Sequence, residues 1–179
     1  PVFHEIGKRL AAEGYTVLVP NPFYRVIKGA LPPDIKMEDR MKFRESIAAA
    51  GAAEKDAAAF VAYLDSQSQV KKSAKIGTTG YCMGGPLTMR TAGTIDRIAA
   101  AGSFHGGGLV TDKPDSPHLL IPKMKAKYLI CVAENDDKNQ PDAKDVLKAS
   151  FAAAKNPADV EVYKANHGWC VPGSQVYNE

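Results

Sequence analysis

The sequence predicts an α/β protein with a mostly parallel sheet flanked by helices, and three observations support this fold class. Short apolar runs alternate with helical segments of about 10–15 residues, which is typical of β-α-β units. The composition, with 45% hydrophobic and 24% charged residues, is that of a folded protein. Reactive side chains follow directly after the predicted strands, where open α/β sheets bind ligands. We expect residues 1–179 to form one domain.

The N-terminal part of the chain predicts a helix, a strand and a longer helical stretch. Apolar residues recur at helical spacing over 3–13, which predicts an amphipathic helix. The run Tyr-Thr-Val-Leu-Val at 15–19 is β-branched and aromatic, so we expect a strand that is buried on both faces. A loop with Pro and Gly covers 23–36, and helix covers 38–65 in two pieces around Gly51.

The rest of the chain predicts four further strands, each a short run of small, apolar or β-branched residues: 75–80, 98–104, 127–133 and 160–163. A helix that ends near Gly93 follows the first of them. A Pro-rich loop covers 111–123, and a helix over 141–155 ends before Pro157, which cannot continue it.

Charge and composition exclude several classes of function. The net charge of +3 comes from 23 basic and 20 acidic residues that are interspersed, which is too weak for an electrostatic nucleic-acid binder. No apolar run approaches the roughly 18 residues of a membrane span. Three cysteines are too few for a disulfide scaffold and favour a reducing compartment. We therefore expect a cytoplasmic monomer or homodimer that acts on a small molecule, with no nucleic-acid or membrane partner.

The most specific motif is Gly80-Tyr81-Cys82-Met83-Gly84, a G-x-S-x-G nucleophile elbow with Cys in place of Ser. In such an elbow a strand turns sharply into a helix, and the nucleophile lies at the apex on a strained backbone. Glycines are needed because the residues before and after the nucleophile approach each other. The N-terminus of the following helix favours a thiolate at Cys82. The Met83 N–H is then one donor of an oxyanion hole.

A candidate acid and a candidate base follow Cys82 in the chain order that this elbow requires. His167 would take the thiol proton, and Asp136 would hold the other ring nitrogen and fix the tautomer. Asp137 is the competing acid, although Asp136 has the more usual distance from the end of its strand. Taken singly, Cys82 is a buried core thiol as easily as a nucleophile. The joint order of all three residues favours a Cys-His-Asp triad.

Other residues near the strand ends are less informative. His105 begins a His-Gly-Gly-Gly run that resembles the oxyanion motif of esterases, but it follows the nucleophile instead of preceding it. We therefore expect His105 only to line the pocket and contact substrate. Trp169 either walls the site or belongs to the core, and Cys131 is an inert core thiol. His167-x-x-Cys170 lacks a second ligand pair, so we expect neither a metal nor another cofactor.

The Cys82 elbow, with Glu134-Asn135-Asp136 and Asn166-His167-Gly168-Trp169, resembles the dienelactone hydrolase family, and the resemblance covers essentially the whole chain. It implies an α/β-hydrolase fold, a Cys-His-Asp triad and esterase or lactonase activity like that of the type member, a carboxymethylenebutenolidase. It also implies two Arg residues that bind a substrate carboxylate. Arg40 is similar in placement to one, but Val171 stands near the position of the other. An anionic dienelactone and a less polar ester or lactone are both candidate substrates.

The resemblance also implies segments that the sequence does not show. Strands before residue 3 and a helix after residue 179 are expected, so we predict a piece of a protein of about 220–250 residues. The early Glu that interacts with the resting thiol in the family, and half of the oxyanion hole, would lie outside this piece.

Two alternatives to a hydrolase stay open. The same fold also serves non-catalytic proteins that bind a small ligand or act in regulation. An exposed thiolate at an elbow is in addition a candidate for reversible oxidation.

Overall fold

The structure is a computed structural model that describes residues 2–29, 31 and 34–178. Its contacts divide the chain into two compact units, which meet in sequence between Lys72 and Ser73, and each is described by itself. The expectation of one domain stays a prediction. In the part of the chain that the structure describes, no helix combines the length and apolarity that crossing a membrane requires.

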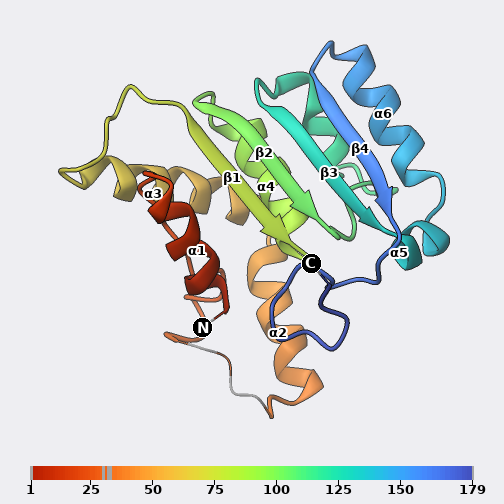
Figure 1. Ribbon diagram of the computed structural model, residues 1–179, viewed down its shortest axis with the longest axis horizontal. Coiled ribbons are helices and arrows are strands. Elements are labelled where there is room, and N and C mark those ends of the chain that lie inside the picture. The colour runs from red at the N-terminus through yellow and green to blue at the C-terminus, as the bar shows by residue number, and fades with distance from the viewer. Residues whose placement is uncertain (1, 30, 32–33, 179) are drawn as a thin grey trace. The chain divides into compact units, whose positions relative to one another are not determined.

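The C-terminal unit contains a four-stranded parallel sheet (Figure 1), which confirms the α/β fold class. Its strands lie in sequence order: β1 (Ile76–Tyr81), β2 (Ile98–Phe104), β3 (Lys127–Ala133) and β4 (Ala158–Tyr163). All four predicted strands of this half are therefore confirmed, with bounds that differ by no more than two residues. Because every pair is parallel, all four strands end at the same edge of the sheet.

A helical layer packs on one face of this sheet (Figure 1) and consists of α4 (Gly84–Thr94), a 3-10 helix η1 (Pro117–Lys123) and α6 (Ala143–Ala153). Large apolar side chains from both layers are almost fully buried between them: Met89, Ile98, Ile121, Ile130 and Leu147. This core fixes the strands, and therefore the loops that follow them.

The predicted loop over 111–123 is wrong for its second half, which forms η1. The physical reason is local: Pro117 stands in the first turn, where its fixed φ favours a helix and its missing N–H is no loss. Packing adds to this, because Ile121 is fully buried and Asn156 Nδ2 donates hydrogen bonds to the carbonyl oxygens of Ile121 (3.0 Å) and Met124 (2.7 Å).

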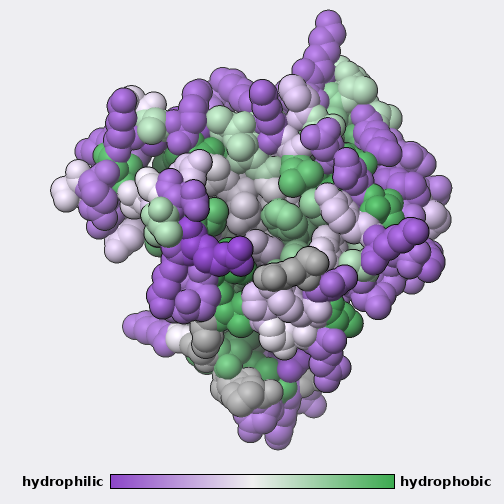
Figure 2. Space-filling model, viewed as in Figure 1, coloured by the Kyte–Doolittle hydropathy of each residue, from purple (hydrophilic) through white to green (hydrophobic). Residues whose placement is uncertain are grey.

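The opposite face of the sheet carries apolar side chains that alternate with the buried ones. Leu129 on β3 is 37% exposed and Tyr163 on β4 is 36% exposed. Figure 2 shows hydrophobic side chains over the strands and hydrophilic ones along the α6 side of the unit. Near the strand ends this face is covered by Trp169, which packs on Cys131 and Ala133.

The N-terminal unit contains the predicted helices: α1 (Val2–Ala12), α2 (Met37–Ala48) and α3 (Ala52–Ser66). The break between the last two lies at Gly51, as predicted. Its φ of 71° is left-handed, a conformation in which residues with a Cβ are strained.

The expected strand over 15–19 is wrong, because the structure assigns no strand to these residues. Tyr15 is 67% exposed and Val19 is 37% exposed, so the run is not buried on both faces. The segment instead lies against α1, where a Cβ on Gly7 would come within 2.8 Å of the Val19 side chain. A β-branched run forms a strand only where a neighbouring strand supplies the ladder, and here a helix supplies the contact.

A buried carboxylate organises this unit. Asp56 on α3 is 8% exposed and accepts two hydrogen bonds from the Arg25 guanidinium, at 2.8 and 2.5 Å, and one from the Tyr24 hydroxyl at 2.9 Å. Burial by itself raises the pKa of Asp56, but the hydrogen bonds from Arg25 and Tyr24 outweigh it and hold that pKa below its ordinary value.

Replacing Asp56 by Asn is expected to reduce the free energy of unfolding by about 1–2 kcal/mol, because it removes the charge that three donors face while Arg25 stays partly solvated. Urea unfolding measures this loss. Asp39→Asn is the control, since its exposed ion pair with Lys42 is worth at most about 0.5 kcal/mol. Equal effects of the two substitutions would contradict the assignment.

Candidate active site

Cys82 lies at the apex of a sharp turn between β1 and α4. Its φ is 52°, a left-handed value that is uncommon for a residue with a side chain. The glycines around it are required, because a Cβ on Gly80 would collide with the Gly84 carbonyl and a Cβ on Gly85 would lie 2.5 Å from Ser103 Oγ. Cys82 itself is exposed. The elbow geometry is thus present, and Cys82 is not a buried core thiol.

Met83 occupies the cap position at the start of α4, with φ −60° and ψ −18°. The first N–H groups of a helix have no acceptor within it and form the positive end of the helix dipole. Met83 adjoins Cys82 at this helix start, and the role of its N–H in an oxyanion hole stays a prediction.

The candidate base and acid contact each other at the ends of β3 and β4. His167 Nδ1 lies 2.7 Å from Asp136 Oδ2, with 34% and 25% of the two side chains exposed. The backbone is fixed as well, since the His167 N–H donates to Asn135 Oδ1 at 2.8 Å and the Glu134 N–H donates to the Ala165 carbonyl at 3.0 Å. Two neighbouring residues, Asn135 and Asp136, therefore hold the backbone and the ring of His167.

The structure distinguishes the two acids that the sequence left open. Asp137 does not face the imidazole; its Oδ1 lies 2.8 Å from Lys144 Nζ, and this hydrogen bond raises the pKa of Lys144. Both acids lie on a short helix, α5 (Glu134–Asn139), that sequence reasoning missed. Consecutive helical residues point in different directions, about 100° apart, so Asp136 and Asp137 have different partners.

His105 follows β2 and is 1% exposed. Its Nδ1 accepts a hydrogen bond from the Cys82 N–H at 3.2 Å, and its ring centroid lies 4.6 Å from that of His167. Burial, and secondarily the nearby His167, lower the pKa of His105. The sequence alone predicts His105 as a substrate contact, whereas its hydrogen bond to the Cys82 backbone depends on the register of two parallel strands.

Trp169 and Arg40, the other predicted substrate contacts, occupy different settings. Trp169 is 9% exposed, contacts the His105 ring at a centroid distance of 5.3 Å and stacks on Tyr163 at 5.6 Å. Arg40 is an exposed residue of α2 in the N-terminal unit. Their contacts with substrate stay predictions.

The other two thiols are less exposed than Cys82. Burial raises the pKa of Cys131, and it raises the pKa of Cys170 to about 11. Both therefore stay protonated at neutral pH. Among the residues that the structure describes, no three His, Cys, Asp or Glu side chains are grouped closely enough to hold a metal ion.

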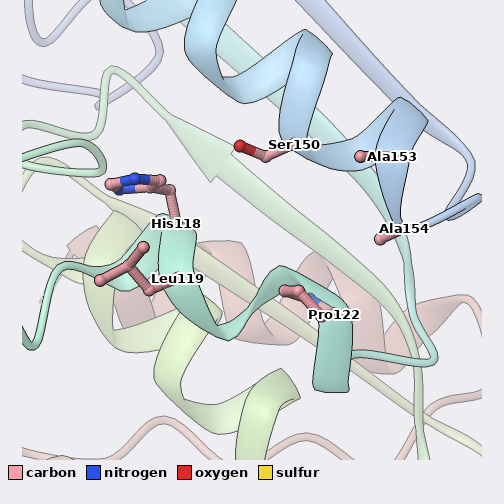
Figure 3. Close-up of a pocket in the computed structure, with 6 residues that line it drawn as sticks. All are labelled: His118, Leu119, Pro122, Ser150, Ala153 and Ala154. Carbon is pink, nitrogen blue, oxygen red and sulfur yellow. The ribbon is translucent and has the colours of Figure 1, made fainter.

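A separate cavity lies between η1 and α6 and is lined by His118, Leu119, Pro122, Ser150, Ala153 and Ala154 (Figure 3). It lies at the C-terminal end of α6, which leads into the beginning of β4, whereas Cys82 and His167 follow strand ends. The cavity and the candidate active site are therefore distinct.

The fold and the elbow define a protein of the α/β-hydrolase class. Residues 2–179 match the dienelactone hydrolase family, and the chain belongs to that family.

Individual proteins resemble the chain in sequence or in fold. Protein usf of Aquifex pyrophilus is 30% identical over 164 residues, which are 88% of this chain and 63% of that protein, so the chain spans less than two thirds of this relative. A solved structure named m3DLH superposes with a TM-score of 0.77 at 23% identity and covers 95% of this chain and 67% of its own. A protein from Klebsiella pneumoniae assigned to the dienelactone hydrolases gives 0.80 at 20% identity, with coverage of 99% and 74%. At these identities the two structures show the shared fold.

The lowered pKa of His105 predicts acid sensitivity of the folded state. In the unfolded chain this imidazole has its ordinary pKa of about 6.5, so it binds a proton more readily than in the folded protein. The neutral His105 therefore makes its full contribution to the free energy of unfolding above about pH 6.5. This contribution is lost as the pH falls from there through the pKa of His105 in the folded protein. We expect the urea midpoint to fall less between about pH 7.5 and about pH 5.5 in His105→Asn than in the wild type. An identical decline in both proteins would contradict the burial of a neutral imidazole.

Proposed function

We propose that this chain carries the catalytic centre of a hydrolase that cleaves ester or lactone bonds of a small molecule. In this proposal Cys82 is the nucleophile, His167 the general base and Asp136 the residue that orients it. The observation that carries the proposal is the 2.7 Å contact between His167 Nδ1 and Asp136 Oδ2 at the same sheet edge as an exposed, strained cysteine.

The acylation half of the reaction follows from these positions. Because Asp136 accepts a hydrogen bond from the Nδ1–H of His167, the lone pair of this imidazole is on Nε2. Nε2 therefore takes the proton of the Cys82 thiol. The thiolate sulfur attacks the carbonyl carbon, and the electron pair of the C=O bond moves to oxygen, which the Met83 N–H stabilises. Collapse of this intermediate breaks the carbon–oxygen bond, and His167 gives its proton to the leaving oxygen. The product is a thioester on Cys82 and a free hydroxyl group.

In deacylation, water is the attacking group and the sulfur of Cys82 is the leaving group. His167 takes a proton from water, the hydroxide oxygen attacks the thioester carbon, and the carbon–sulfur bond breaks. The acid is released and Cys82 recovers its proton from His167. In a lactone the leaving hydroxyl stays tethered to the acyl group, so the product is a single hydroxy acid. None of these steps uses a cofactor.

The substrate proposed is an uncharged or weakly polar ester or lactone. Val171 stands near the place where the family resemblance implies a second carboxylate-binding Arg, and an apolar side chain cannot pair with an anion there. Arg40 and Trp169 are proposed as further substrate contacts, and an anionic dienelactone is the competing substrate. A monomer or homodimer in the cytoplasm is the proposed form.

Removal of the nucleophile tests the proposal directly. In the full-length protein, Cys82→Ala is expected to lower kcat/KM for p-nitrophenyl acetate and for a panel of lactones by at least about 10³-fold, because no thioester can form. Cys82→Ser retains a poor nucleophile, so its kcat/KM should lie between those of the wild type and Cys82→Ala. Cys170→Ala is the matched control and should stay near wild type, since its thiol is protonated at neutral pH. Full activity of Cys82→Ala would overturn the proposal, and saturable binding of these compounds without turnover would favour a binding protein.

The adjacent acids provide a second, internally matched test. Asp136→Asn is expected to lower kcat by about 10²–10⁴-fold, because the neutral amide can donate its N–H to Nδ1 and thereby favour the wrong tautomer of His167. Asp137→Asn, one residue away and paired with Lys144, should change kcat less than about threefold. Steady-state kinetics of both variants measure these losses. A larger loss in Asp137→Asn than in Asp136→Asn would contradict the proposal that Asp136 orients His167.

A further inference from the structure

His105 is a buried imidazole that the proposed reaction does not use. His105 is 1% exposed, and its Nε2 atom is buried with no hydrogen-bond partner in the part of the chain that the structure describes. Its backbone φ is 41°, left-handed like that of Cys82. A buried polar group with an unsatisfied atom destabilises a fold, and an apolar side chain would fill the same space without that penalty. The combination calls for a role that an apolar side chain cannot supply.

The contacts of His105 connect the nucleophile with the base. Its Nδ1 accepts the Cys82 N–H at 3.2 Å, and that same N–H lies 3.1 Å from the Phe104 carbonyl oxygen. Two consecutive residues at the end of β2 therefore hold the amide of the nucleophile. The ring of His105 lies against His167 on one side, at 4.6 Å between centroids, and against Trp169 at 5.3 Å.

The hydrogen bond also defines the protonation state of His105. A nitrogen that accepts a hydrogen bond carries a lone pair, so the single proton of the neutral ring resides on Nε2. His105 is itself anchored, because its N–H donates to the Cys131 carbonyl at 2.8 Å. Burial and the neighbouring His167 lower its pKa, which favours the neutral ring.

We propose that His105 is a positioning residue: its Nδ1 holds the backbone of Cys82 in the strained elbow, while its ring sets the place of His167 beside it. This inference rests on the proposed pairing of Cys82 with His167, and it assigns His105 a function other than substrate contact. The acceptor atom is the essential part. A displacement of about 1 Å between a nucleophile and its base is enough to lower a rate by about 10²-fold.

Two nearly isosteric substitutions separate this role from simple packing. In His105→Asn the side-chain oxygen takes the place of Nδ1 and still accepts the Cys82 N–H. In His105→Leu the shape is almost the same but no acceptor is present. Packing alone favours Leu at a buried position, whereas positioning favours Asn, so the two accounts predict opposite orders.

The readout is the rate constant for alkylation of Cys82 by iodoacetamide at neutral pH, followed by peptide mass spectrometry in the full-length protein. We expect this rate constant in His105→Asn to lie within about tenfold of wild type, and that of His105→Leu to be lower by about 10²-fold. Because alkylation needs no substrate, the result is independent of whether esters are turned over. Leu reacting as fast as Asn, or both reacting like wild type, would refute the proposal.

A measurement on the unsubstituted protein covers the case in which a variant does not fold. Nitrogen-15 shifts of the histidine rings report which nitrogen carries the proton. The proposal requires His105 to be neutral, with the proton on Nε2, at neutral pH. A protonated ring, or a proton on Nδ1, would exclude the hydrogen bond to Cys82 and with it the positioning role.

Discussion

The sharp turn at Cys82 is the constraint on which the candidate site depends. A left-handed residue between a strand and a helix is possible here only because glycines on both sides let the backbone of α4 approach β1 and β2. The turn exposes the sulfur and places the start of α4 beside it. An alanine at Gly80 would have to displace the main chain of Gly84, so the glycines and the nucleophile form one unit.

The parallel sheet brings the other residues of the candidate site to this strained turn. Because all four strands end at one edge, residues far apart in the sequence come together there: Cys82 after β1, His105 after β2, Asp136 after β3 and His167 after β4. Each is held by backbone hydrogen bonds or by the core beneath it. The nucleophile, the acid and the base of the proposed reaction therefore all follow the ends of consecutive strands.

Much of this could be predicted from the sequence, for identifiable reasons. The strands of the C-terminal unit are short runs rich in small, apolar or β-branched residues with clear breaks between them, and the elbow has a spacing that few other structures require. The predictions that failed, or that left a choice open, concern residues whose structure depends on contacts with other parts of the fold, and a local sequence pattern does not contain those contacts. The run at 15–19 has strand propensity, but a helix instead of a strand packs beside it. The choice between Asp136 and Asp137 depends on α5, a single turn or so of helix, and the contact of His105 with Cys82 depends on strand register.

The most direct test of the account is to trap the covalent intermediate. The full-length protein would be mixed with p-nitrophenyl acetate, quenched in acid within the first turnover and digested for mass spectrometry. We predict an acetyl group on the peptide that contains Cys82, formed and lost at rates that match turnover. Turnover with no acyl group on Cys82, or with one on another residue, would contradict the account.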